Sequence, residues 1–159
     1  MTHEEKFITF SLGKEEYGIS IDKVKEIIEM LDITPIPRTP DFVKGVINLR
    51  GKLIPVINLR QRFEMQAIPY DKTTCILVVE REQKGGKKLL GIIVDSVSEV
   101  VTLEDSHITT APAYNDIKNK YIPLIGKFKD KIIMLLKIDD IFGSEDVIGI
   151  KNAAEINAA

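Results

Sequence analysis

The sequence predicts a mostly β protein made of two similar small barrels with minor helix, and three observations support this. Short runs of β-branched and aliphatic residues recur at roughly 10-residue spacing, as they do in small barrels. Several of these runs are joined by short turns that contain glycine or a charged tripeptide. Two strand-rich stretches in the first half of the chain also have counterparts in the second half.

The first forty residues predict two strands, a short helix and an extended segment. Phe7–Leu12 has the period-two pattern of a half-buried strand, and Tyr17–Ile21 follows it after a turn at Gly13. Four apolar residues then recur at helical spacing, which favours one face of a short helix: Val24, Ile27, Ile28 and Leu31. The next segment, Ile33–Pro40, carries three prolines and is therefore an edge strand or a loop.

The rest of the chain predicts three hairpins and a few helical turns. The three strand pairs are Val46–Leu49 with Leu53–Ile57, Thr74–Glu80 with Lys88–Val94, and Tyr121–Phe128 with Ile132–Leu136. Leu59–Phe63 and Ile138–Phe142 are expected to form single helical turns, and Asp95–Leu103 is a short mixed segment. The residues after Gly149 are rich in alanine and asparagine and predict a loosely held tail.

An internal repeat supports the division into two barrels. Gly18–Ile28 aligns without gaps on Gly91–Val101, with the shared pattern G-I-x-h-D-x-V-x-E-h-h, where h is aliphatic. Leu53–Phe63 aligns in the same way on Ile132–Phe142, and the two offsets are 73 and 79 residues. Chance similarity between strand-rich segments is the alternative. If the repeat is real, two lobes too small to be stable alone share an apolar core and form a cleft between them.

The composition excludes most chemistry. The 159 residues include two histidines and one cysteine, Cys75, so neither a disulfide nor a zinc-type ligand set is available. Gly85-Gly86 lacks the spacing of a phosphate-binding loop, and no serine or cysteine has a nucleophile motif. We therefore expect no enzyme activity, no metal and no other cofactor.

Charge and the ends of the chain bear on partners and location. The formal charge is −2 and the aromatic residues are scattered, which disfavours a nucleic-acid partner. The N-terminal sequence has acidic residues where a signal peptide would have basic ones, and no aliphatic run is long enough for direct membrane insertion. A single cysteine fits a reducing cytoplasm.

Four motifs in combination resemble the CheW family of chemotaxis coupling proteins. They are Glu16–Ile19, Lys44–Gly51, Ile54–Arg60 and Gly91–Asp95, and the resemblance runs from about residue 7 to residue 142. It implies two five-stranded, SH3-like barrels around a shared core, within a domain of residues 5–147 that precedes a tail of residues 148–159. The implied lobes are roughly residues 15–82 and residues 5–14 with 83–147.

The resemblance also implies a function and a set of contact residues. The family acts as a cytoplasmic, non-catalytic adaptor that joins methyl-accepting chemoreceptors to the regulatory domain of the histidine kinase CheA in a signalling array. Seven residues match its receptor-facing groove: Val24, Glu26, Ile27, Ile28, Arg50, Val97 and Val100. Of these, Glu26 is a rim residue and Arg50 is the position tied to coupling. The kinase-facing surface is expected around Ile33 and Ile36.

The residue patterns leave other interpretations open. Each apolar residue of the groove could instead belong to the core, Arg50 could be a solvated turn residue, and Glu26 an ordinary surface acid. At the level of function, an adaptor for another CheA-like pathway, in motility or development, has the same pattern. A small nucleic-acid-binding barrel is the alternative from a different class.

Overall fold

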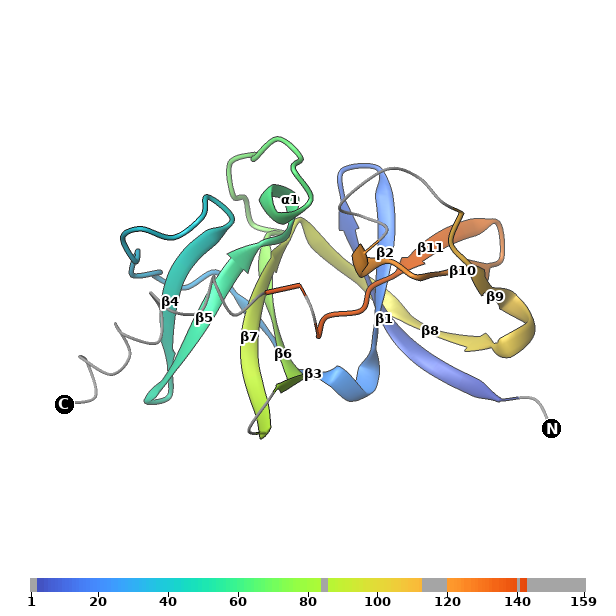
Figure 1. The fold of residues 1–159 in the computed structure, drawn as a ribbon. Coiled ribbons are helices and arrows are strands. Elements are labelled where there is room, and N and C mark those ends of the chain that lie inside the picture. Colours follow the sequence, from blue (N-terminus) through green and yellow to red (C-terminus); the bar gives the residue numbers. More distant parts are fainter. Residues whose placement is uncertain (1–2, 84–85, 113–119, 140, 143–159) are drawn as a thin grey trace.

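Two β-sheets lie side by side and form the fold (Figure 1). The computed structural model describes residues 3–83, 86–112, 120–139 and 141–142. These residues contain eleven strands, six in one sheet and five in the other, and only short helices. The predicted mostly β class is therefore confirmed.

The six-stranded sheet is called the terminal lobe, because its strands come from both ends of the chain. Its strand order is β8-β1-β2-β11-β10-β9. The strands are β1 (Glu4–Leu12), β2 (Glu15–Ser20), β8 (Ser96–Glu104), β9 (Ile108–Thr110), β10 (Leu124–Phe128) and β11 (Lys131–Leu135). The two outermost strands, β8 and β9, are joined along the chain by the three-residue 3₁₀ helix η2 (Asp105–His107) alone. Because three residues span about 10 Å at most, the sheet curls and its edges approach each other.

The five-stranded sheet is called the central lobe, and its strand order is β3-β6-β7-β5-β4. The strands are β3 (Val24–Glu29), β4 (Val43–Leu49), β5 (Lys52–Asn58), β6 (Cys75–Gln83) and β7 (Gly86–Val94). The chain leaves the edge strand β3 and pairs with the opposite edge, where the N–H of Thr34 donates to the carbonyl of Val46 (2.9 Å) and the reverse bond measures 3.0 Å. This pair closes the second barrel.

Short helices lie where strands end. The 3₁₀ helix η1 (Ile21–Lys23) joins β2 to β3, and the single-turn helix α1 (Leu59–Arg62) follows β5. The side chain of Asn58 caps α1, because its Oδ1 accepts the backbone N–H of Gln61 at 3.1 Å. The helical turn expected at residues 59–63 is confirmed, and so are the three hairpins.

The strand registers support the internal repeat. The two parallel pairs in the structure place Leu135 opposite Gly18 and Val56 opposite Gly91. In the sequence repeat, Gly18 matches Gly91 at the offset of 73 residues, and Val56 matches Leu135 at the offset of 79 residues. The edge strands repeat as well, since β3 pairs with β6 in the central lobe and β8 pairs with β1 in the terminal lobe. The two lobes are therefore built on one strand plan.

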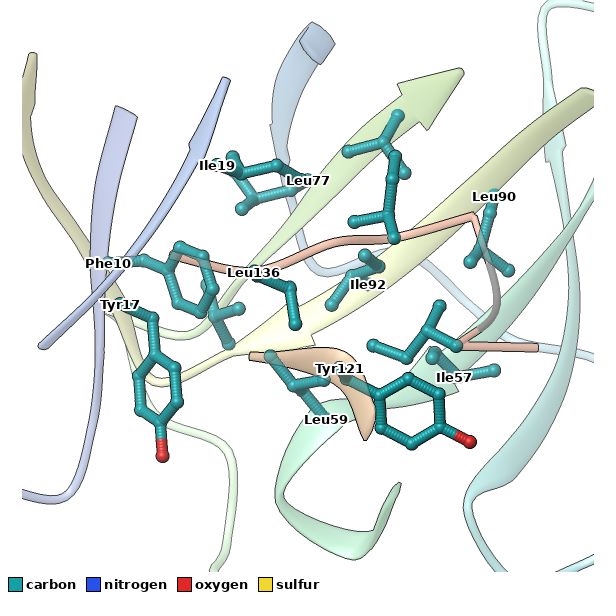
Figure 2. Close-up of a cluster of buried hydrophobic side chains, with 14 of the residues drawn as sticks. Phe10, Tyr17, Ile19, Ile57, Leu59, Leu77, Leu90, Ile92, Tyr121 and Leu136 are labelled. Atoms are coloured by element: carbon teal, nitrogen blue, oxygen red, sulfur yellow. The ribbon is translucent and has the colours of Figure 1, made fainter. Parts of the chain in front are cut away.

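A large hydrophobic cluster joins the two lobes, and we call it the shared core. Figure 2 shows it, with Ile19 of the terminal lobe beside Leu77 of the central lobe. The same cluster contains Phe10 and Tyr17 of the terminal lobe and Leu90 and Ile92 of the central lobe. Each lobe also has a smaller core of its own, called the central core (Ile47, Ile54, Val56, Ile76, Val78, Ile93) and the terminal core (Phe7, Val101, Leu103, Ile133, Leu135). Because side chains alternate along a strand, one strand supplies both: Ile76 and Val78 of β6 enter the central core, and Leu77 and Val79 the shared core.

The boundaries expected for the lobes are wrong in two places. Strand β2, at residues 15–20, belongs to the terminal lobe, and β7, at residues 86–94, belongs to the central lobe. The reason is that short hairpin turns keep β1 beside β2 and β6 beside β7, so the chain changes lobe only after the second strand of each hairpin. The terminal lobe also has six strands rather than five, because β9 adds to its edge.

The helix expected from Val24 to Leu31 is also wrong, because residues Val24–Glu29 form the edge strand β3. The segment pairs with β6 over its length, from Val24 opposite Val79 to Glu29 opposite Cys75. Valine and isoleucine suit a strand, and pairing with a neighbouring strand overrides a weak helical periodicity. The tail at residues 148–159 lies outside the described residues.

Candidate functional site

The candidate site contains two equivalent sheet edges, β3 and β8, each the outermost strand of its sheet. Each edge carries one valine packed against the shared core, Val24 in β3 and Val97 in β8. Each also exposes a second aliphatic residue, with Ile27 45% and Val100 52% exposed. Exposed aliphatic side chains at the same place in both lobes form a pair of candidate contact surfaces. In the described strand pairings β3 joins only β6 and β8 only β1, so the two edges do not touch through their backbones.

Ile28 has a different environment from Ile27. In β3 the side chains alternate, so Ile28 is partly buried and packs against the central core. It was expected to share an apolar helix face with Val24 and Ile27, and the strand removes that arrangement. Ile28 therefore supports the barrel from inside.

Both edges contain a β-bulge. The register of β3 against β6 shifts between Val24 and Glu26, and that of β8 against β1 shifts opposite Thr9. At the second bulge the Thr9 hydroxyl donates to the carbonyl of Glu99 and accepts its N–H, both at 3.1 Å. A bulge interrupts the row of free backbone groups that an added strand would need. The edges therefore favour a partner that contacts side chains.

An ion pair lies beside the β3 edge. Arg50 and Gly51 form the β4–β5 turn with φ angles of 51° and 89°, the backbone of a two-residue hairpin turn. The Gly51 N–H donates to Oδ1 of Asn48 at 2.8 Å, which fixes the turn. From there Arg50 donates to Oε2 of Glu26 at 2.5 Å, and this hydrogen bond holds the pKa of Glu26 below its ordinary value. The Arg50 side chain remains 71% exposed, so a partner can reach it.

The residues expected to face the kinase lie on the segment that closes the central barrel. Ile33 packs against the central core and Ile36 against the shared core, and both are only partly buried. Between them, Thr34 approaches Gly45 so closely that a Cβ on Gly45 would lie 1.9 Å from the Thr34 carbonyl oxygen. With a φ of +136°, position 45 requires glycine. Ile33 and Ile36 therefore have a structural role at least in part.

A second ion pair, not expected from the sequence, holds the two lobes together. Arg60 of α1 donates to both carboxylate oxygens of Asp95 at 2.8 and 2.6 Å, and Asp95 also accepts the N–H of Gly13 at 2.7 Å. Asp95 lies where the chain crosses from β7 to β8. The Arg60 hydrogen bond lowers the pKa of Asp95. Arg60 and Asp95 both occur in the sequence motifs, but only the fold brings them together.

The described residues offer no chemistry of another kind. They contain no group of three His, Cys, Asp or Glu side chains placed to hold a metal ion. Burial raises the pKa of the Cys75 thiol, which makes it less reactive. None of the helices described is long and apolar enough to cross a membrane.

Comparison with known proteins decides the family. The model of the CheW-like domain matches residues 6–146. The chain belongs to the CheW family. It is 38% identical to the chemotaxis protein CheW of Klebsiella aerogenes, with 95% of this chain and 89% of that protein covered. The CheW protein of Helicobacter pylori is 33% identical over 86% of this chain and 80% of its own length.

A solved CheW structure matches the fold. The crystal structure of the scaffolding protein TtCheW from Thermoanaerobacter tengcongensis superposes with a TM-score of 0.82 at 36% identity, covering 91% of this chain and 96% of that one. The CheW family is a scaffold and adaptor family, and not a catalytic one. The function expected from the sequence, a chemotaxis coupling adaptor, is thereby confirmed.

Proposed function

We propose that this CheW protein works in the cytoplasm without catalysing a reaction, and joins the cytoplasmic tips of chemoreceptors to the kinase CheA. The observation that carries this is the pair of equivalent edges β3 and β8, each with an exposed aliphatic side chain beside an anchored one. Two contact surfaces on one rigid shared core suit a protein that holds partners in a fixed relation.

The receptor-facing part of this surface comprises the two edges and the Glu26–Arg50 pair. Ile27 and Val100 supply exposed apolar contacts, and Val24 and Val97 fix the edges to the core. An amphipathic helix suits this surface better than an added strand, because bulges interrupt both edges. Arg50 can donate charged hydrogen bonds to the helix, since Glu26 occupies only part of its guanidinium.

The kinase-facing part is proposed to include the closing segment with Ile33 and Ile36. This segment lies at the edge of β4, on the opposite side of the central sheet order from β3. A surface there would leave the β3 edge open to a receptor. The same adaptor could serve another CheA-like kinase, and the binding experiment distinguishes the two by the kinase that is captured.

The test measures binding of purified receptor cytoplasmic fragments and of CheA to the full chain. Burying one aliphatic side chain contributes about 1.5–3 kcal/mol, so Ile27→Asp and Val100→Asp should each weaken receptor binding at least tenfold. Both residues are exposed, so both variants should melt within about 2 °C of the wild type and bind CheA.

A matched control is Ile132→Asp, because Ile132 is 66% exposed on β11, which β1 and β2 separate from β8 in the sheet. This variant should bind receptors like the wild type. Wild-type receptor affinity in both edge variants would place the receptor site elsewhere, and failure of the unmodified chain to bind either partner would overturn the adaptor proposal.

A further inference from the structure

The central barrel has an open mouth beside the Arg50–Gly51 turn. A groove of about 600 Å³ lies there, between β3, the β4–β5 turn and the hairpin of β6 and β7. Its floor is apolar: Ile54 and Val78 belong to the central core, and the partly buried Leu49 and Leu89 pack on that core. An aliphatic side chain entering the groove would extend an existing hydrophobic cluster.

The rim of the groove is charged, with an excess of cations. Four basic residues and two acidic ones line it: Lys25, Arg50, Lys52, Lys87, Glu26 and Glu80. Both carboxylates are already paired, Glu26 with Arg50 at 2.5 Å and Glu80 with Lys25 at 3.4 Å and Lys87 at 3.7 Å. The rim therefore keeps a net positive charge on a chain whose overall charge is −2, and it favours an acidic occupant.

The repeat allows a comparison, because the matching turn of the terminal lobe carries different side chains. The β10–β11 register puts Phe128 and Lys131 where the β4–β5 register puts Leu49 and Lys52. Phe128 packs against the terminal core, and the Lys129 ammonium lies 5.3 Å from the centre of its ring. Lys131 pairs with Glu16 of β2 at 3.6 Å and with Glu99 of β8 at 3.7 Å.

Two lining residues of the groove differ in the terminal lobe: Phe128 occupies the position of Leu49, and Glu16 occupies the position of Leu89. The first residues of the two turns are alike, with a φ of 54° at Lys129 and 51° at Arg50. The second residues differ, because Gly51 has a φ of 89° and Asp130 has no positive φ. The apolar floor of the groove therefore depends on Leu49 and Leu89, which the terminal lobe does not repeat.

We propose that the open mouth of the central lobe binds an acidic segment of a protein partner, with one aliphatic side chain inserted over Leu49 and Leu89. Carboxylates of that segment face Lys52 and the exposed part of Arg50. The proposal deepens the adaptor function and rests on it, because the adaptor supplies the need for a protein partner. It adds the chemistry of one contact and the pocket that receives it.

The experiment uses the isotope-labelled full chain and short synthetic helical peptides, followed by NMR. The first peptide contains glutamates, alanines and one leucine; the second has alanine for the leucine, and the third has lysines for the glutamates. The first should shift the backbone amide resonances of residues 49–52 and 89, and added salt should weaken it. Removal of its leucine should weaken binding at least tenfold, and the lysine peptide should cause no shift.

Two variants test the pocket itself. Leu49→Phe introduces the residue of the terminal lobe and should block the peptide while the spectrum stays dispersed. Lys52→Glu, at an exposed position, should weaken the acidic peptide and strengthen the lysine peptide. If Leu49→Phe fails to fold, Lys52→Glu still decides the outcome.

Several results would overturn the proposal. These are no shift with the first peptide, equal binding of the lysine peptide, or unchanged binding to both variants. Equal shifts from free glutamate would indicate a small carboxylate site, and shifts on raising the concentration of the chain alone would indicate a second copy. If receptor fragments and CheA still bind the wild-type chain, these outcomes remove only the pocket and leave the adaptor function standing.

Discussion

The central and terminal lobes share a strand plan and differ in the side chains placed on it. At equivalent register positions the central lobe has Gly45 and Leu49, and the terminal lobe has Leu124 and Phe128. Gly45 admits the closing segment at Thr34, whereas Leu124 is 40% exposed beside β9. The comparison teaches that the strand plan repeats, while side chains at matching positions differ and change how each sheet closes.

The largest expected effect comes from cutting the chain at the lobe boundary that the sequence predicted, which lies inside the central sheet. A fragment ending at Glu82 keeps β1 to β6 but loses Leu90, Ile92 and Val94 from the shared core. Because the lobes bury their largest cluster against each other, this fragment should be unfolded, with poor amide dispersion in NMR. A well-dispersed fragment with a cooperative melt would mean that the shared core forms without β7 and the strands that follow it.

The next effect sharpens the contrast between Gly45 and Leu124. Gly45→Ala places a methyl group against the Thr34 carbonyl and strains a φ of +136°, so the free energy of unfolding should fall by about 3 kcal/mol. Leu124→Ala removes a side chain that is 40% exposed and should cost less than about 1 kcal/mol. Urea denaturation of both variants measures the difference. Equal losses would contradict the distinct closure of the two barrels.

A third effect concerns the edges, where each lobe has one anchored and one exposed residue. Val24→Asp puts a carboxylate against the shared core and should lower the free energy of unfolding by about 2 kcal/mol. Ile27→Asp, on a residue 45% exposed, should lower it by about 0.5 kcal/mol or less. Val97→Asp and Val100→Asp should repeat the pattern in β8. A stable Val24→Asp variant would show that this valine serves the surface alone.

The smallest effect, on the order of 1 kcal/mol, is a pH dependence at the junction of the lobes. The pKa of Asp95 is lowered in the folded state by its pairing with Arg60. This pairing therefore stabilises the protein fully at pH values above the unfolded pKa of about 3.9. This stabilisation is lost as the pH falls through the lower folded pKa. Asp95→Asn should therefore be less stable at neutral pH and show a shallower loss on acidification.

Asp22→Asn is the matched control, because Asp22 occupies the repeat position of Asp95 and is exposed. Chemical denaturation between neutral pH and pH about 2.5 should give this variant the acid transition of the wild type. If Asp95→Asn has that same transition, the Arg60–Asp95 pair does not account for the acid sensitivity.

The sequence predicted much of the fold, because the relevant signals are local. Turn residues such as Gly51 and alternating runs such as Phe7–Leu12 identify hairpins without knowledge of distant contacts. The β3 segment was misread because its four apolar residues fit a helical period as well as a strand. Pairing with β6, which is distant in the sequence, decided between the two.

Of the candidate site, the sequence predicted the residues and not their arrangement. Val24, Ile27, Val97 and Val100 lie on the two edges, but burial separates the anchored pair from the exposed pair. Ile28 turns inward because strand alternation, not helical spacing, sets its direction. Burial depends on which strand lies against which core, and no local pattern records that.

By itself, the sequence determined the mostly β class, the three hairpins, the repeat and the family, since these follow from turn chemistry, residue periodicity and motifs read along the chain. The tertiary structure alone decided which strands belong to which lobe, that Asp95 meets Arg60, and that a groove with an apolar floor and a charged rim lies beside the Arg50–Gly51 turn. The physical reason is that these features depend on contacts between residues far apart in the chain, where packing and pairing outweigh local preference.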